Sequence, residues 1–330
     1  MRARTVRFVG PYRVEVGDVE VPEPQDGQLL VRAEHSGISA GTEMLAFRGE
    51  LDPSLPRDEA LGALSGTFAY PFPYGYAVVG RVERSRAGIP DGARVFAFHP
   101  HQDLFVVDEA DAVELDGGDP RLAALLPLVE TGLQISLDAA PRLGEDVVVL
   151  GLGCVGTLAA ALLARAGARV IGSEPDPARR RAAAAFGVRT VEPAELESRV
   201  TAATGGRGAD LVVEATGSPA ALSEALPLLA HEGTALVCSW YGTKPVSLPL
   251  GADFHRRRLT IRSSQVSTIP ARLAGRWDRA RRRAVTRALL DELPLAELAT
   301  HEFPFEAAAD AYAAIDRGEP GLIHATLRYA

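Results

Sequence analysis

Three glycines, Gly151, Gly153 and Gly156, complete a G-x-G-x-x-G pattern, and the acidic residue Glu174 follows about twenty residues later. Gly151 suits a tight turn, Gly153 leaves room for a pyrophosphate against the backbone, and Gly156 permits close packing of a helix on a strand. The free N–H groups at a helix N-terminus favour phosphate binding. The spacing therefore predicts a dinucleotide site in which Glu174 binds the ribose hydroxyls, which favours NAD over NADP.

The element that must hold these glycines is a strand–turn–helix unit. Residues 147–150 form a β-branched apolar run that predicts a buried parallel strand, and an alanine- and leucine-rich helix is expected to reach about residue 165. Cys154 and Val155 lie inside the turn and belong to the same predicted nucleotide site. Residues 147–164 carry no charge, but they are glycine-broken and weakly apolar, which argues against a membrane span.

Two composition regimes divide the chain. Residues 1–118 hold short apolar runs punctuated by Gly and Pro, which is typical of a compact β-rich domain. From about 146 to 261 strands and helices alternate, which predicts a doubly wound parallel sheet. A polar loop is expected at 48–66. The remaining predicted elements are helices at 122–140, 279–291 and 305–315 and a closing strand at 323–328.

Bulk composition limits the classes of function. The 330 residues are 47% hydrophobic and 24% charged, enough for one large or two ordinary globular domains. The net charge of −8 argues against nucleic acid or a membrane surface as a partner. Two cysteines make no disulfide framework, and the N-terminus has no apolar signal core. We therefore expect a soluble, cytoplasmic protein.

Several motifs together resemble the medium-chain dehydrogenase/reductase family over essentially the whole chain. They lie at 37–43 (GISAGTE), 75–80, 91–95, 151–156, 208–217 and 303–315. The resemblance implies the α/β class: a GroES-like β-rich catalytic domain at 1–118, a Rossmann dinucleotide-binding domain at 119–290, and a return segment at 291–330 completing the catalytic domain. It also implies hydride transfer to or from nicotinamide in the cleft between the domains, a small-molecule substrate, and a homodimer or homotetramer. The GISAGTE segment resembles the branch that contains bacteriochlorophyllide a dehydrogenase and threonine or sorbitol dehydrogenase-like proteins.

The zinc ligands of this family have no good counterpart in the chain. Zinc-dependent members place a cysteine where this chain has Ser39 and a histidine where it has Tyr76, and the third position falls on Pro127. Tetrahedral zinc needs Cys, His or carboxylate donors, so no catalytic zinc is expected. The alternative is a displaced site that uses Glu43, Glu130 or His99 with His101. Otherwise the two histidines are expected to face the surface or the substrate.

Without zinc, side chains must polarise a carbonyl or take a hydroxyl proton. The resemblance places Tyr76 at the lost histidine, where a phenol can donate to an oxyanion, and matches Thr42 with the proton-relay hydroxyl of the family. Glu130 is expected near the nicotinamide as a base. The alternatives are core packing for Tyr76, a turn role for Thr42 and a helix cap for Glu130. Glu43 is expected to orient backbone, and His35 to be a satisfied core histidine.

Further cofactor residues follow from the resemblance. Thr131 resembles the threonine beside the nicotinamide, and Arg179 the basic residue that flanks the adenosine ribose. Other candidates follow sheet strands at the carboxyl edge, where ligands collect, and Trp240 or Tyr241 is expected to wall the nicotinamide. These candidates are Ala215, Thr216, Ser239, Trp240 and Tyr241. The arginine runs 256–258 and 281–283 are expected to be solvated, and binding of an acidic group of the substrate is the alternative.

Taken together, the sequence predicts a zinc-independent oxidoreductase that prefers NAD(H), with NADP as the alternative, and interconverts a secondary alcohol and a ketone. One alternative is an enoyl reductase of the quinone-oxidoreductase type, which needs little acid catalysis. The other is an NAD(H)-binding protein without chemistry, because all three metal ligands are lost. The sequence leaves the substrate open.

Overall fold

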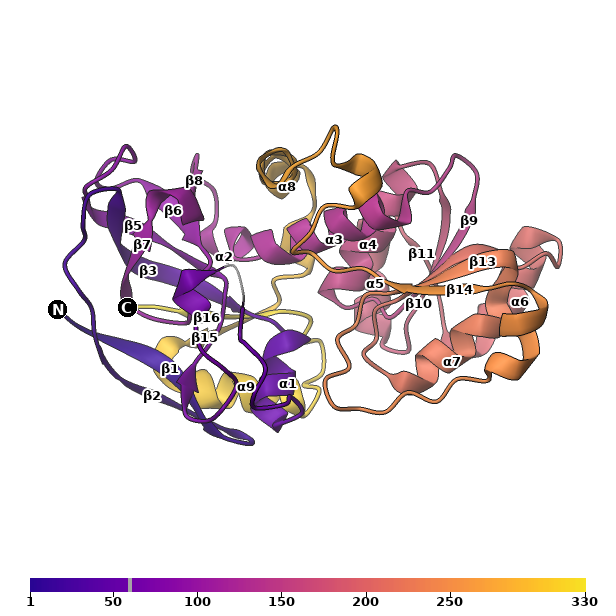
Figure 1. Ribbon diagram of the computed structural model, residues 1–330, viewed down its shortest axis with the longest axis horizontal. Helices are drawn as coiled ribbons and strands as arrows, with labels where there is room; N and C mark the ends of the chain where they lie inside the picture. The colour runs from indigo at the N-terminus through magenta and orange to yellow at the C-terminus, as the bar shows by residue number, and fades with distance from the viewer. Residues whose placement is uncertain (59–60) are drawn as a thin grey trace. The chain divides into compact units, whose positions relative to one another are not determined.

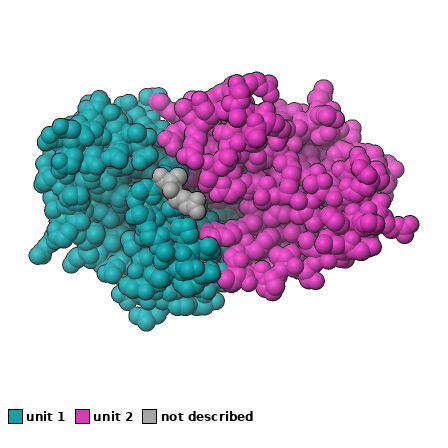
Figure 2. Space-filling model, in the orientation of Figure 1, with its two compact units in different colours: residues 1–126, 299–330 teal, residues 127–298 magenta. Residues whose placement is uncertain are grey.

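The computed structural model describes residues 1–58 and 61–330, so Glu59 and Ala60 in the expected 48–66 loop lie outside the described residues. The chain divides into two compact units (Figure 2): unit 1 is residues 1–126 and 299–330, and unit 2 is residues 127–298. These bounds lie eight residues beyond the expected 118 and 290. Among the described residues, no helix is both long enough and apolar enough to cross a membrane.

The expected helix at 122–140 is in fact two helices, one in each unit. Helix α2 (Pro120–Ala123) begins at an Asp119 cap and packs against two strands of unit 1, β3 (Gln28–Ile38) and β5 (Val78–Ser85). Helix α3 (Leu126–Ala139) opens unit 2. Packing of α2 on the β-rich unit therefore explains why the unit boundary comes later than the composition suggests.

Unit 2 is built on a six-stranded sheet in the order β11-β10-β9-β12-β13-β14. Figure 1 labels β9, β10, β11, β13 and β14 of this sheet. All its strand pairs are parallel. Its strands are β9 (Asp146–Leu150), β10 (Arg169–Ser173), β11 (Arg189–Val191), β12 (Ala209–Glu214), β13 (Leu229–Val237) and β14 (Thr260–Ser263). Counted from β9, this is the 3-2-1-4-5-6 order of the Rossmann fold. The predicted doubly wound sheet is confirmed, and the strand order reverses between β9 and β12.

Alternate residues of β9 face opposite layers of helices, as expected for a central parallel strand. Val147 and Val149 pack with residues of α3, α4 and α5, whereas Val148 and Leu150 pack with residues of α6 and α7. The helices of unit 2 after α3 are α4 (Cys154–Arg165), α5 (Pro177–Ala185), α6 (Pro193–Thr204), α7 (Pro219–Leu228) and α8 (Arg279–Glu292). Burial on both faces fixes the carboxyl end of β9, from which the glycine turn emerges.

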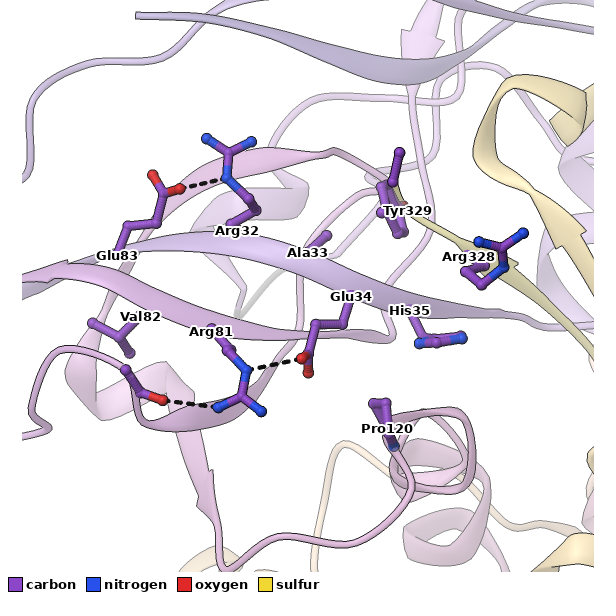
Figure 3. Close-up of a pocket in the computed structure, with 12 residues that line it drawn as sticks. Arg32, Ala33, Glu34, His35, Arg81, Val82, Glu83, Pro120, Arg328 and Tyr329 are labelled. Carbon is purple, nitrogen blue, oxygen red and sulfur yellow. Dashed lines mark hydrogen bonds and ion pairs between the residues drawn. The ribbon is translucent and has the colours of Figure 1, made fainter.

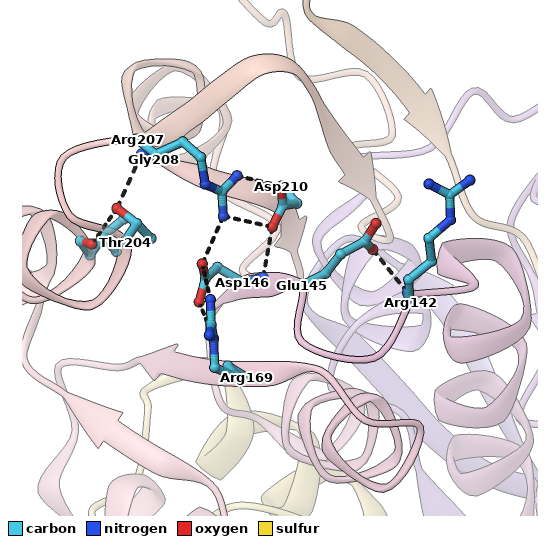
Figure 4. Close-up of polar contacts among 9 residues, drawn as sticks. Arg142, Glu145, Asp146, Arg169, Thr204, Arg207, Gly208 and Asp210 are labelled. Atoms are coloured by element: carbon cyan, nitrogen blue, oxygen red, sulfur yellow. Dashed lines mark hydrogen bonds and ion pairs between the residues drawn. The ribbon is translucent and has the colours of Figure 1, made fainter.

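At the end of the sheet away from the glycine turn, ion pairs and hydrogen bonds link β9, β10 and β12 (Figure 4). Asp146, the first residue of β9, accepts two hydrogen bonds from Arg169 of β10 (2.8 and 2.7 Å) and one from Arg207 (2.8 Å). Arg207 also bonds Asp210 of β12, and Asp210 accepts from the Asp146 N–H (2.8 Å). This network fixes the register of three neighbouring strands at the edge away from the glycine turn.

Unit 1 is the β-rich part of the molecule, as predicted. A three-stranded sheet has the order β2-β1-β4, and a seven-stranded sheet has the order β15-β16-β3-β5-β6-β8, with β7 also paired to β3. The further strands are β1 (Arg2–Gly10), β2 (Arg13–Glu20), β4 (Phe72–Pro73), β6 (Arg94–Ala97), β7 (Leu104–Asp108), β8 (Ala112–Leu115), β15 (His301–Pro304) and β16 (Ala325–Arg328). Its other helices are α1 (Thr42–Arg48) and α9 (Ala308–Asp316).

The returning C-terminal segment completes the larger sheet of unit 1. Strand β16 pairs antiparallel with the end of β3, with Ala325 opposite Ile38 and Arg328 opposite His35. Helix α9 brings the fully buried Tyr312 into the aromatic core beside Phe8 and Phe47. Segments from both ends of the chain therefore surround the 37–43 motif.

Candidate functional site

The glycine turn of unit 2 has the geometry of a phosphate cradle. Gly151 has a φ of +84°, and a Cβ there would lie 3.0 Å from the Ala215 carbonyl oxygen. A Cβ on Gly156 would lie 1.9 Å from the Gly151 oxygen, so only glycine fits at either position. A Cβ on Gly153 would meet nothing within 4 Å. The first and third glycines are therefore required by packing, while open space remains at Gly153, directly before the N-terminus of α4, which begins with Cys154 and Val155.

Glu174 has a structural role that the sequence pattern did not reveal. The residue is only 4% exposed, and its carboxylate accepts from the Leu152 N–H (2.9 Å) inside the glycine turn and from the Asp176 N–H (3.0 Å). It thus ties the turn after β9 to the loop after β10. Each carboxylate oxygen retains a further acceptor site, so the predicted bonds to ribose hydroxyls stay compatible with this geometry.

Arg179 and Arg180 differ in how many of their N–H groups are hydrogen-bonded. Arg180 donates to the Glu174 and Pro175 carbonyl oxygens and to the Glu192 carboxylate, so it supports the loop. The buried Nε of Arg179 makes no hydrogen bond, although Asp176 lies 3.8 Å away. Burial raises the pKa of the Cys154 thiol to about 12, and the nearby Arg179 charge opposes that rise. The charge of Arg179 therefore acts on the start of α4, and its Nε keeps donor capacity for an anion.

The turn after β12 is organised by Glu214, a fully buried carboxylate that sequence reasoning missed. Glu214 accepts from the Thr216 N–H (2.6 Å) and from the hydroxyl of Tyr241 (2.7 Å). Ser239 joins the same turn by accepting from the Gly217 N–H (2.8 Å). The sequence signal that could have identified Glu214 is an acidic residue at the last position of a predicted strand.

Two other cofactor candidates lie in the same part of the sheet. Ala215 supplies the carbonyl oxygen beneath Gly151, and Trp240, which follows β13, is 43% exposed. The structure thus brings the predicted residues from 215 to 241 to the carboxyl edge of β12 and β13, beside the glycine turn. Their contacts to a cofactor stay a prediction.

Glu130 is half of a buried ion pair in unit 2. Its Oε1 accepts from Nε of Arg282 (3.0 Å), and both residues are 4% exposed. The Nη1 of Arg282 also donates to Gln134 (2.5 Å) and to the Val266 carbonyl oxygen (2.6 Å). The expectation that residues 281–283 are solvated is therefore wrong for Arg282, which turns inward because Glu130 and Gln134 supply acceptors. Thr131 beside it donates to the Pro127 carbonyl oxygen within α3 (2.8 Å).

The two predicted hydroxyl donors of unit 1, Tyr76 and Thr42, lie near Ser39, which stands at the position of a lost zinc ligand. Ser39 follows β3, Thr42 begins α1, and Tyr76 precedes β5. The side chains of Ser39 and Thr42 lie near enough to the Tyr76 hydroxyl to favour its phenolate. Burial, together with the charge of Glu43, nevertheless raises the pKa of Tyr76 to about 12. Tyr76 is therefore a protonated phenol at neutral pH, able to donate.

Glu43 lies behind these hydroxyls in a fully buried polar network. Its Oε1 accepts from the Ser39 N–H (2.8 Å), while its Oε2 contacts Nε2 of His101 (2.9 Å) and accepts from the Tyr312 hydroxyl. Nδ1 of His101 contacts the Ser36 hydroxyl (2.7 Å). Glu43 thus orients the Ser39 backbone, in keeping with the expectation, but it also collects three donors.

The expectation that His99 and His101 face the surface or the substrate is wrong. His101 is fully buried because Glu43 and Ser36 satisfy both ring nitrogens. His99 is 9% exposed and stacks on Phe105, with ring centroids 4.2 Å apart. Burial lowers the pKa of His99 to about 4. An alternating His-x-His pair carries no sequence signal that separates such burial from exposure.

The side chains at the three expected ligand positions do not fit the zinc site of the family that this chain resembles. Ser39, Tyr76 and Pro127 include no thiolate, imidazole or carboxylate. In the displaced alternative, Glu43 pairs with His101, Glu130 pairs with an arginine, and His99 lies against a ring. Within residues 1–58 and 61–330, no group of three potential metal-ligating side chains gathers. Zinc independence itself stays a prediction.

Comparison with known proteins gives one family and whole-chain relatives. A family model described as zinc-binding dehydrogenase matches residues 154–282. The chain is 28% identical to 2-desacetyl-2-hydroxyethyl bacteriochlorophyllide A dehydrogenase of Cereibacter sphaeroides, over 95% of this chain and 94% of the relative. It is 26% identical to L-galactonate-5-dehydrogenase of Escherichia coli, over 89% of each. A solved oxidoreductase/dehydrogenase of unknown specificity from Escherichia coli superimposes with a TM-score of 0.82 at 18% identity, over 100% of both chains.

Proposed function

Because this chain is a member of the medium-chain dehydrogenase/reductase family, we propose that it is a zinc-independent oxidoreductase that interconverts a secondary alcohol and a ketone with NAD(H). Two of its relatives are named as dehydrogenases of a hydroxyethyl group and of a sugar acid, and both substrates carry hydroxyls. The observation that carries the proposal is the cluster of the hydroxyl side chains of Tyr76, Ser39 and Thr42, which occupies the motif positions where metal chemistry would otherwise be expected.

Unit 2 is the proposed cofactor unit. The open space at Gly153 and the N-terminus of α4 suit a pyrophosphate, while Glu174 suits the free ribose hydroxyls. When bound, the nicotinamide supplies or accepts the hydride. The acid at Glu174 favours NAD, and Arg179, with its donor capacity, makes NADP the alternative.

Unit 1 is proposed to supply the proton. Hydride addition to a ketone produces an alkoxide. In a reaction near neutral pH this alkoxide needs a proton from a nearby donor. Tyr76 is protonated there, and the hydroxyls of Ser39 and Thr42 stabilise a phenolate once the proton has left. The phenolate then regains a proton from solvent, so one hydride and one proton are consumed for each alcohol formed. In the oxidative direction the same groups accept the hydroxyl proton.

Turnover of secondary alcohols with NAD, and of ketones with NADH, tests the proposal directly. Tyr76→Phe is expected to lower kcat at least about tenfold, because a general acid contributes ~10²–10⁴ in rate. NADH affinity should stay within about twofold, because the proposed cofactor residues all belong to unit 2. Thr42→Val should act in the same direction more weakly. Tyr12→Phe, at a tyrosine that is 57% exposed, is the matched control and should leave kcat unchanged.

Other outcomes assign other functions. Parent rates in both hydroxyl variants would contradict the proton-donor role. Turnover of α,β-unsaturated ketones alone would favour an enoyl reductase, and tight NADH binding without any turnover would favour a non-catalytic binding protein. Elemental analysis of the same preparation should find well under one zinc per chain. Stoichiometric zinc, lost together with activity on chelation, would contradict the metal-free reaction.

A further inference from the structure

The buried carboxylate of Glu43 is the point at which polar side chains of unit 1 meet. Glu43, His101, Ser36 and Tyr312 are each 0% exposed. A carboxylate removed from water is costly unless its oxygens are hydrogen-bonded. Here the Ser39 N–H, the His101 ring and the Tyr312 hydroxyl satisfy it. A network of this completeness fixes the positions of all its members.

The network runs from Glu43 to a surface cavity. Nε2 of His101 lies 2.9 Å from the carboxylate and Nδ1 lies 2.7 Å from the Ser36 hydroxyl, which in turn lies 2.9 Å from the Tyr329 hydroxyl. Tyr329 lines a cavity of about 540 Å³ with Arg32, Arg81 and Arg328 (Figure 3). The arginines in this cavity are paired with acids, for example Arg81 with Glu34. Tyr329 therefore borders both the buried network and this cavity, whose arginines are already paired.

His101 also contacts the backbone that carries Tyr76. Its main-chain N–H donates to the Tyr74 carbonyl oxygen (3.2 Å). Its ring lies against Gly75, which has a φ of +114° and where a Cβ would come within 2.5 Å of the imidazole. Both the conformation and the space exclude a side chain at Gly75. The ring therefore sets the path of the backbone directly before Tyr76.

Glu43 acts on the other partner of Tyr76. It accepts from the Ser39 N–H (2.8 Å). The Ser39 hydroxyl accepts from the Thr42 N–H (3.4 Å) and lies near the Tyr76 hydroxyl, whose phenolate it favours. Two different backbone segments that hold the Tyr76 hydroxyl, one at Ser39 and one at Gly75, thus depend on the same buried pair.

We propose that His101 and Glu43 are a positioning pair for the reaction: together they fix the Ser39 and Gly75 segments around the Tyr76 hydroxyl. The inference rests on the proposed role of Tyr76 as proton donor. The titratable groups whose charges act on Tyr76 are Glu43 from α1 and Tyr74, which lies two residues before it in the chain. Because burial of Tyr74 raises its pKa, it stays neutral, and Glu43 is the charge that matters.

Glu43→Gln tests the charge. Removing the negative charge is expected to lower the pKa of Tyr76, because Glu43 now raises it. Ultraviolet titration of tyrosinate, taken as the difference from Tyr76→Phe, reads this shift without any turnover. The alkaline limb of the kcat profile should move to lower pH. At neutral pH kcat should fall by about fivefold or more, because an amide offers one acceptor oxygen where the carboxylate offers two, so the segments around Tyr76 are held less firmly and part of the ~10²–10⁴ that a well-placed general acid supplies is lost.

Glu302→Gln is the matched control. Glu302 also pairs with a histidine of unit 1, His35, at 2.9 Å, but this pair is partly exposed. The Tyr76 titration and kcat should be unchanged in this variant. A Tyr76 titration in Glu43→Gln equal to that of the parent would overturn the inference.

His101→Gln tests positioning with the charge of Glu43 retained. Its amide can still donate to Glu43, so the protein should fold even if Glu43→Gln does not. We expect kcat to fall several-fold while KM for NADH is unchanged, because a misplaced donor affects the transition state and not cofactor binding. A parent kcat would overturn the inference. If Tyr76→Phe itself keeps the parent rate, the proposed function fails, and the titration of Glu43→Gln still decides whether the pair controls Tyr76.

Discussion

The two units each bury an acid, but they satisfy it with different kinds of donor. Glu43 in unit 1 is held by an imidazole, a phenol and a backbone amide, whereas Glu130 in unit 2 is held by the guanidinium of Arg282. Arg282 supplies a rigid fork of donors from a single side chain. Glu130 is therefore anchored mainly by one partner, whereas Glu43 is held by three donors from different segments of unit 1.

The anchor in unit 2 extends beyond the pair. Gln134, which accepts from Arg282, also donates to Asp138 (3.1 Å) and to the Thr268 carbonyl oxygen (3.0 Å). Asp138 in turn accepts from the Ser264 hydroxyl (2.6 Å). Arg282 thereby joins α8 to α3 and to residues 264–268. This arrangement competes with the expected general-base role of Glu130, because the carboxylate oxygen is already committed to a cation.

The largest expected effect is at this anchor. Arg282→Met should lower the free energy of unfolding by about 3–5 kcal/mol, because it leaves Glu130 charged and buried without its partner. The double variant Arg282→Met/Glu130→Met should recover most of the loss, because an apolar pair avoids that desolvation cost. Urea unfolding followed by circular dichroism measures both changes.

Arg281→Met is the matched control, since Arg281 is the exposed neighbour in the same helix. Its expected change is within about 0.5 kcal/mol. If Arg281→Met lowers the free energy of unfolding by a similar amount, or if the double variant does not recover stability, the buried charge of Glu130 is not the cause of the loss in Arg282→Met.

The second prediction concerns acid, which should act on unit 1. Burial lowers the pKa of both His99 and His324 from 6.5 to about 4, and both belong to unit 1. As the pH falls below 6.5 the unfolded chain binds protons before the folded one, so stability that is complete above 6.5 is lost progressively down to about 4. Each histidine should lower the free energy of unfolding by about 1–2 kcal/mol as the pH falls from about 7 to about 5.

Replacement of one histidine in each unit checks this dependence. His99→Phe, which keeps the stacking on Phe105, should flatten the pH dependence of the urea midpoint. His255→Phe in unit 2 removes an exposed histidine and should leave the dependence unchanged. Equal slopes in the parent and both variants would mean that unit 1 is no more sensitive to acid than unit 2.

The contrast between the units also explains what the sequence could predict. The glycine turn was predictable because its requirements are local: Gly151 needs a positive φ, and Gly156 must approach Gly151 within the same turn. The strand order of unit 2 followed from the alternation of strands and helices. The family motifs located Tyr76 and Thr42 in the same unit, and the Thr42 side chain lies near the Tyr76 hydroxyl.

The partners of the buried acids could not be predicted, because they come from distant parts of the chain. Glu43 meets His101 58 residues later and Tyr312 269 residues later. Arg282 lies in an arginine run that looks solvated, and only packing of α8 on α3 turns it toward Glu130, 152 residues away. Periodicity describes which face of an element is apolar, but it does not tell which polar side chain of another element completes a buried pair.

The smallest predicted effect concerns Glu174, a buried acid held by backbone amides alone. Glu174→Gln removes the charge that should repel a 2′-phosphate, so the preference for NADH over NADPH should narrow by about 1 kcal/mol. Loss of one backbone acceptor should loosen the glycine turn equally for both cofactors, and the ratio of the two dissociation constants cancels that change. Glu192→Gln is the control, because this acid also lies beside Arg180 but is exposed. Two outcomes would contradict this prediction: NADPH binding to the parent as tightly as NADH, or an unchanged ratio of dissociation constants in Glu174→Gln. Either would mean that Glu174 only supports the glycine turn and that Arg179 selects the cofactor.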